Sequence, residues 1–242
     1  MGRAVVFCMK IEIFSDVVCP WCAIGKRRFE AALGEFSHAD EVDVHWRAFE
    51  LDPSAPTVPD PGVDTAAHLA AKYGMTREAA VASREKLAAM AALDGLDFHF
   101  EKTKRGNTFD AHRLLHYAYE VGLQDELKER LFVAYFTEGA LISDRATLVR
   151  LGGEIGLDEA KSADVLDEDR YAAEVREDEL EARTLGINGV PFFVIDRRYG
   201  ISGAQSPAAI LQVLGEAWAK SHPLTVMSDD PGLACEGDAC SI

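Results

Sequence analysis

The sequence predicts an α/β fold in which strands stand at both ends of the chain and helices fill the middle. Residues 9–14 and 42–51 alternate apolar and polar side chains, the period of a half-buried strand. Residues 192–196 and 199–202 form a second strand pair, joined by a tight turn. From residues 64 to 185 apolar side chains instead recur every three or four positions, as in amphipathic helices. We therefore expect a β-α-β unit and a later β-β-α unit separated by a helical insertion.

The first strand leads into the motif Cys19-Pro20-Trp21-Cys22, after which a helical pattern begins. Pro20 suits the first helical position, because the N–H that it lacks would be unpaired there. Cys19 is then the N-cap, beside unpaired backbone donors and the positive end of the helix dipole. Such a position lowers the pKa of a thiol from its usual value of roughly 8.5. We predict that Cys19 is the nucleophile and that Cys22 resolves a mixed disulfide formed on Cys19.

Half of a zinc site is the structural alternative for the two cysteines. Zinc usually takes four ligands from paired motifs, and the sequence holds no second Cys-X-X-Cys and no matching histidine pair. The motif therefore favours redox chemistry without a metal.

The order of the segments predicts the domain boundaries. The strand at 42–51 should pair in parallel with the first strand, and four prolines in residues 52–62 then mark an exit from the domain. We expect one domain built from 9–60 and 170–222 and a helical insertion at 61–169.

Within the insertion the apolar side chains of the helices are expected to form a core rather than a cofactor site. We expect helices at 64–73 and 76–93, one beginning at residue 107 or 108, and a helical pattern that continues from 158 to 185. The charged run 176–183 is interpreted as the solvated face of its helix.

Charge and hydropathy exclude several classes of partner. The 242 residues carry 41 acidic and 25 basic side chains, a net charge of −16, which repels nucleic acids and anionic membrane surfaces. No apolar run reaches the roughly eighteen residues that cross a bilayer. The chain start leads directly into the first strand, which leaves no room for a cleavable signal. We expect a cytoplasmic protein, and in that compartment paired thiols more often cycle than stabilise a fold.

Three cysteines lie outside the motif. Cys235 and Cys240 stand in the C-terminal tail, residues 223–242, with four residues between them, one of which is a glycine. We hypothesise that they form an auxiliary redox pair; the alternative is two idle thiols in a terminal tail. Cys8, beside the first strand, is interpreted as a small buried hydrophobic residue.

Two motifs together resemble the DsbA family of thioredoxin-fold proteins: Cys19-Pro20-Trp21-Cys22 and the later segment 189–194, which contains Val190-Pro191. Segments 14–22 and 107–112 resemble its cytoplasmic FrnE-like branch more closely. The resemblance covers roughly residues 9 to 220. It implies a thioredoxin fold with a helical insertion, and dithiol–disulfide exchange. It also implies that the Val190–Pro191 bond is cis and lies opposite the dithiol.

The resemblance suggests roles for further residues. The backbone of Val190 would bind an extended substrate segment next to Pro191, Pro20 and Trp21. Trp21 stands where the best-known periplasmic members carry histidine, which implies a less depressed thiol pKa and a weaker oxidant. His112 would shuttle protons if its helix covers the dithiol; the alternative is an ordinary surface or core histidine.

Asp16 and Lys26 flank the motif. They either tune its electrostatics or are merely a loop residue and a solvated helix residue.

The sequence thus predicts a thiol–disulfide oxidoreductase or isomerase that needs no cofactor, because the electrons move within its own sulfurs. Protein or small-molecule thiols and disulfides are the expected partners, with glutathione as a candidate co-substrate, and the chain is expected to be a monomer or a homodimer. One alternative is a glutathione-dependent isomerase or kappa-type glutathione transferase on the same fold; those relatives commonly lack the second cysteine, so Cys22 argues against it. Another is a chaperone or binding module, which would suppress aggregation without either thiol.

Overall fold

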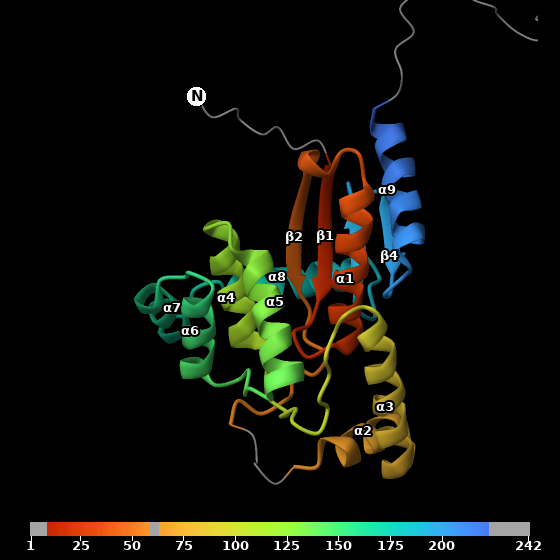
Figure 1. Ribbon diagram of the computed structural model, residues 1–242. Coiled ribbons are helices and arrows are strands. Elements are labelled where there is room, and N and C mark those ends of the chain that lie inside the picture. Colours follow the sequence, from red (N-terminus) through yellow and green to blue (C-terminus); the bar gives the residue numbers. More distant parts are fainter. Residues whose placement is uncertain (1–8, 59–62, 223–242) are drawn as a thin grey trace, which may run out of the picture.

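The computed structural model describes residues 9–58 and 63–222, and its central element is a mixed sheet (Figure 1). The strands are β1 (Met9–Ser15), β2 (Val42–Ala48), β3 (Phe192–Ile195) and β4 (Tyr199–Ser202), in the order β2-β1-β3-β4. Strand β1 pairs in parallel with β2, and β3 runs antiparallel to both β1 and β4. The predicted β-α-β unit and hairpin are confirmed, although β2 ends at Ala48 rather than at residue 51.

Helices cover both faces of the sheet. Ile11 and Ile13 belong to one apolar cluster with side chains of α1 (Pro20–Glu35) and α9 (Pro207–Ser221), while Phe14 packs on the other face with Ala182 of α8 (Ala172–Thr184). This separation follows from the alternation of side chains along a strand. The prediction of a half-buried first strand was wrong, because β1 is central and every residue after Lys10 is buried.

Charged side chains occupy buried positions between the sheet and α8. Glu12 of β1 is 2% exposed and pairs with Arg47 and Arg197. Asp178 of α8 is equally buried, accepts a 2.7 Å hydrogen bond from the backbone N–H of Ala48 and pairs with Arg47. The charged run 176–183 is therefore not simply a solvated face: Asp178 supplies a hydrogen-bond acceptor to the end of β2.

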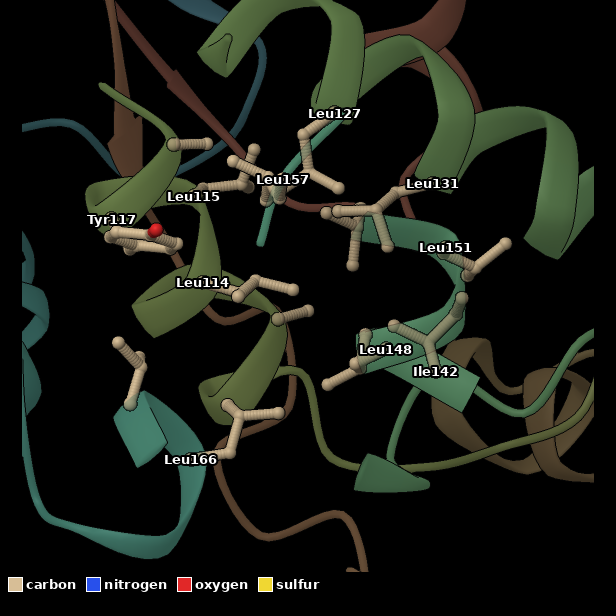
Figure 2. Close-up of a cluster of buried hydrophobic side chains, with 14 of the residues drawn as sticks. Leu114, Leu115, Tyr117, Leu127, Leu131, Ile142, Leu148, Leu151, Leu157 and Leu166 are labelled. Atoms are coloured by element: carbon tan, nitrogen blue, oxygen red, sulfur yellow. The ribbon is translucent and has the colours of Figure 1, made fainter. Parts of the chain in front are cut away.

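The middle of the chain forms a separate helical core. It is built from α4 (Phe109–Glu120), α5 (Gln124–Val133), α6 (Arg145–Glu154) and α7 (Glu159–Asp167), with one π-helical turn, Ala134–Glu138, after α5. Figure 2 shows their side chains meeting; the fully buried ones include Leu114, Leu127, Leu131, Leu148 and Leu151. Burial of each such leucine stabilises the fold by about 1.5–3 kcal/mol. The burial of these side chains together confirms the predicted core.

Helices α2 (Thr65–Tyr73) and α3 (Arg77–Leu93) pack against each other beyond the end of the sheet where β1 finishes and α1 begins (Figure 1). The helices predicted at 64–73 and 76–93 are confirmed; Asp64 and Thr76 are their N-caps, and Gly74 ends α2 with φ of 65°. The continuous helical pattern predicted for 158–185 was wrong, because the chain turns between α7 and α8, where Tyr171 has φ of 60°.

A 3₁₀ turn, Ala39–Glu41, precedes β2. Among the helices within residues 9–58 and 63–222, none combines the length and apolar character needed to cross a membrane.

Candidate active site

The two cysteines of the motif lie where β1 gives way to α1. Cys19 is the N-cap with extended backbone angles and Pro20 occupies the first turn, so their predicted positions are confirmed. Both cysteines are free thiols; Cys19 is 4% exposed and Cys22 is fully buried. The backbone N–H of Cys22 bonds to the carbonyl of Cys19 at 3.0 Å, which holds the two residues in one helical turn.

The Val190–Pro191 bond is cis and stands opposite the dithiol. The Cys19 thiol donates to the carbonyl oxygen of Val190, with 3.5 Å between Sγ and oxygen. The structure thus brings together two motifs that lie 171 residues apart in the sequence.

Gly25 is a site residue that sequence reasoning missed. A Cβ atom on Gly25 would lie 2.8 Å from Cγ of Pro191, closer than real Cβ contacts allow. Only a residue without a side chain lets α1 approach Pro191 this closely. The signal was a glycine inside a predicted helix, where glycine normally destabilises by roughly 0.5–1 kcal/mol relative to alanine.

Behind the dithiol Asp16 and His112 form a buried pair, each about 1% exposed. Nε2 of His112 lies 3.3 Å from Oδ1 of Asp16, and the backbone N–H of Leu51 donates to Oδ2 at 2.8 Å. Burial raises the pKa of the Asp16 carboxyl, but the bonds from His112 and Leu51 outweigh it and leave that pKa below its usual value.

Burial likewise lowers the pKa of His112, although the Asp16 carboxylate opposes this. A neutral imidazole that donates to an ionised carboxylate fits both directions. His112 is a buried residue, not a surface one. Its side chain contacts Asp16, three residues before Cys19, rather than a sulfur atom. Its role as a proton shuttle stays a prediction.

The surroundings of Cys19 oppose its ionisation. A hydrogen bond shared with the Cys22 thiol raises the pKa of Cys19, burial raises it further, and the Asp16 carboxylate adds to this; the Cys22 backbone N–H acts in the opposite direction. The prediction of a lowered pKa was therefore wrong for the dithiol form. The helix start does supply a stabilising donor, but burial and the second thiol outweigh it.

Lys128 of α5 is a second buried charge that sequence reasoning missed. Its side chain is fully buried, and Nζ lies 5.4 Å and 5.3 Å from the ring centres of Trp46 and Phe132. Within the described residues Nζ has no hydrogen-bond partner. Burial lowers the pKa of Lys128 to about 8, while the neighbouring Cys22 and Asp16 act to raise it.

Lys26 is not the solvated helix residue that one interpretation expected. It is 2% exposed, and its ammonium group pairs with three carboxylates: Glu30, Asp125 and Glu129. These pairs join α1 to α5, so Lys26 fixes the helical insertion against the first helix of the sheet domain.

A cleft of about 660 Å³ opens beside the dithiol. One wall carries Val190 together with Cys19, Pro20 and Trp21, whose indole is 41% exposed. Three of the predicted substrate-binding residues, Val190, Pro20 and Trp21, therefore line one cavity, whereas Pro191, the fourth, is not part of its lining. Much of the remaining lining, which the sequence analysis did not assign to the site, comes from α2, α3, the segment before α4 and the π-helical turn after α5; it includes His68, Lys72, Arg84, Arg105 and Tyr135.

The remaining predicted site residues cannot be placed. Cys8, Cys235 and Cys240 lie outside the described residues, so the auxiliary redox pair stays a prediction. Within residues 9–58 and 63–222, no three His, Cys, Asp or Glu side chains gather as a metal ion would need.

Comparison with known proteins agrees with this geometry. The family model described as DSBA-like thioredoxin domain matches residues 10–215. The protein YwbO of Bacillus subtilis, itself described as uncharacterized, is 32% identical over 187 residues, which is 76% of this chain and 86% of that protein. A probable DsbA oxidoreductase of Streptomyces coelicolor is similar in structure, with a TM-score of 0.82, 42% identity and coverage of 97% of this chain and 99% of that one. The cytosolic disulfide reductase DsbM of Pseudomonas aeruginosa shares the fold, with a TM-score of 0.61, 20% identity and coverage of 87% and 99%.

Proposed function

The chain belongs to the DsbA-like thioredoxin domain family and has the fold of DsbA oxidoreductases, and from this premise we propose that it carries out dithiol–disulfide exchange through Cys19 and Cys22. The observation that carries the proposal is the position of the two thiols. They lie in one turn at the start of α1, and the Cys19 sulfur is 3.5 Å from the backbone of Val190 beside the cleft.

The exchange proceeds in two balanced steps. The Cys19 thiolate attacks one sulfur of a substrate disulfide; a Cys19–substrate bond forms, the substrate S–S bond breaks, and one substrate thiolate leaves. The Cys22 thiolate then attacks Sγ of Cys19, forms the internal disulfide and releases the second thiolate. Two electrons pass from the dithiol to the substrate, and the reverse sequence oxidises a substrate dithiol.

The backbone of Val190 is suited to guide the substrate. It faces the Cys19 sulfur from the loop that precedes β3, so an extended segment entering the cleft can bond to it as a strand bonds to a sheet edge. Cys22 is shielded from the cleft by its complete burial, which favours its role as the resolving thiol. A second thiol in this position also favours exchange over a glutathione-dependent isomerisation, which needs no resolving cysteine.

The test isolates the two thiols. A variant with Cys8, Cys235 and Cys240 changed to serine is reduced, incubated with hydroxyethyl disulfide, quenched with acid, alkylated and weighed by mass spectrometry. We expect an internal disulfide in this variant, a trapped mixed disulfide when Cys22→Ser is added, and no adduct when Cys19→Ser is added.

If Cys19 alkylates like an ordinary peptide thiol and no internal disulfide forms, the proposed exchange function is wrong. Turnover of the full chain that clearly exceeds turnover of the triple-serine variant would support the auxiliary pair of Cys235 and Cys240.

A further inference from the structure

The cleft beside Cys19 has a charge opposite to that of the protein. Among the described residues that line it, Asp52 is the single carboxylate, and it already pairs with Arg105 at 2.6 Å. Against it stand His68, Lys72 and Arg84. In a chain with 41 acidic and 25 basic residues, a random lining would be acidic. The balance in the cleft therefore needs a local explanation.

Arg84 of α3 provides the main observation. Its guanidinium donates to Oγ1 and to the carbonyl oxygen of Thr65, at 2.9 and 3.0 Å, and lies 5.7 Å from the ring centre of Phe100. No carboxylate of the described residues lies within ion-pair distance of it, whereas most arginines of this chain are paired. Burial lowers the pKa of Arg84 from its usual value, although the Tyr135 hydroxyl and the more distant Asp64 carboxylate act to raise it, so Arg84 is a positioned cation without a direct ion pair.

Arg84 retains binding capacity. A guanidinium has five N–H donors, and the two bonds to Thr65 leave three of them. Planar donors of this kind bind carboxylates strongly and often in pairs. Lys72, on the neighbouring helix α2, is exposed and also lacks a carboxylate partner in the described part of the chain. Both side chains line the cleft that Cys19 also lines.

The size of the cleft and the position of the sulfur limit the ligand. About 660 Å³ falls within the range of small-molecule sites, roughly 300–1,000 Å³. With Cys19 only 4% exposed, a disulfide held on the surface of a folded protein cannot reach the sulfur, whereas a small flexible disulfide inside the cleft can.

We propose that the substrate is a low-molecular-weight disulfide that carries a carboxylate, bound by Arg84 and Lys72 while one of its sulfurs meets Cys19. This inference rests on the proposed exchange function and adds the substrate class to it. The reaction is the one already balanced above: the dithiol becomes a disulfide, and the substrate leaves as two thiols that bear the carboxylates.

Three disulfides of nearly equal length test the inference: 3,3′-dithiodipropionate, hydroxyethyl disulfide and cystamine, which are anionic, neutral and cationic. Single-turnover oxidation of the reduced triple-serine protein is followed by acid quench and mass spectrometry, and each rate is divided by that of an ordinary peptide thiol. We expect the corrected rate to be highest for the anionic disulfide, lower for the neutral one and lowest for the cationic one. The overall charge of −16 would give the reverse order, so the result distinguishes local from long-range electrostatics.

Variants then locate the effect. Arg84→Gln should slow the anionic disulfide by about tenfold or more, the loss expected for a charge-assisted hydrogen bond, and leave the neutral one within about twofold. Lys72→Gln, at an exposed position, should act in the same direction without affecting folding. Lys86→Gln is the matched control, because it removes the same charge from the same helix. Lys86 is exposed and does not line the cleft.

Each outcome decides one question. Equal corrected rates for the three disulfides, or equal losses in the Arg84→Gln and Lys86→Gln variants, would overturn the inference while leaving the exchange function intact. Failure of the reduced protein to reduce any of the three disulfides would instead contradict the proposed function itself.

Discussion

Replacing Gly25 by alanine tests the contact on which the site geometry depends. The new Cβ would lie 2.8 Å from Cγ of Pro191, and neither the helix backbone nor a proline ring can move aside cheaply. Overpacking of this kind costs about 1–3 kcal/mol. Alanine also gains about 0.5–1 kcal/mol over glycine inside a helix, so we expect a net destabilisation of about 1–2 kcal/mol.

Gly34 provides the matched control in the same helix. A Cβ on Gly34 would meet no atom within 4 Å, so Gly34→Ala carries the helix term without the clash and should stabilise by up to about 1 kcal/mol. The two variants should therefore differ by about 2 kcal/mol. For a chain of this size such a difference corresponds to about 4–8 °C in Tm, measured by circular dichroism. If Gly25→Ala melted at or above Gly34→Ala, the close contact with Pro191 would not exist in solution.

The same pair of variants has a catalytic readout. Relief of the clash must shift Pro191 and the adjoining Val190 relative to Cys19, whose thiol donates to the Val190 carbonyl at 3.5 Å. Because small displacements at a reacting group are costly, we expect Gly25→Ala to reduce hydroxyethyl disulfide about three- to tenfold more slowly. Gly34→Ala should match the unmodified protein, and an equal decrease in both variants would mean that the loss is not local.

Substitutions at three buried ionisable residues are tested by urea unfolding. His112→Ala should lower the free energy of unfolding by about 2–3 kcal/mol at pH 7, because Asp16 loses a charge-assisted hydrogen bond, and His112→Gln should lower it by less; equal losses would contradict the pairing. Burial lowers the pKa of His45 from 6.5 to about 3, so the unfolded state binds more protons than the folded state between these pH values. Acidification from pH 6.5 to pH 4 should therefore lower the free energy of unfolding of the unmodified protein by about 3 kcal/mol, a loss that the His45→Gln variant should not show. Burial raises the pKa of Glu50 from 4.5 to about 7, so folding binds a proton whose stabilisation disappears as pH rises through 7; Glu50→Gln should gain about 2 kcal/mol on the unmodified protein between pH 5 and pH 8, whereas parallel curves would refute the shift.

Local chemistry made much of the fold predictable from sequence. Asp64 and Thr76 cap helices because their side chains bond to nearby backbone N–H groups, and Gly74 ends one because it tolerates a positive φ. Pro20 stands at a helix start because the N–H that it lacks would be unpaired there. In each case the residue and its partner lie within a few positions of each other, so the pattern contains the whole interaction.

The failures share the opposite property. Asp178 was assigned to a solvated face, but it is buried because Arg47 and Ala48, 130 positions away, provide its partners. The pKa of Cys19 was expected to fall because only the helix start is visible in the sequence, whereas its burial depends on side chains from the insertion. A partner that is distant in the chain leaves no periodic signal.

Lys128 marks the limit of sequence reasoning most clearly. It lies between Leu127 and Leu131 on a helix whose apolar face is buried. The sequence pattern therefore placed Lys128 beside that face but did not predict that its side chain is buried. A charged residue beside an apolar stripe usually extends its head into solvent. Here the rings of Trp46 and Phe132 enclose the ammonium group instead, and one of them comes from a strand far earlier in the chain.

The helical insertion therefore takes part in the chemistry of a motif that it does not contain. Helix α4 supplies His112 to Asp16, α5 supplies Lys128 beneath the dithiol, and α3 supplies Arg84 to the cleft. The two thiols themselves stand at the start of α1, which follows β1 in the thioredoxin fold. It follows that the ionisation of the thiols and the charge of the accepted substrate can change through substitutions in the insertion alone. Under the proposed function, the Cys-Pro-Trp-Cys motif carries out the exchange and the helices around it select the substrate.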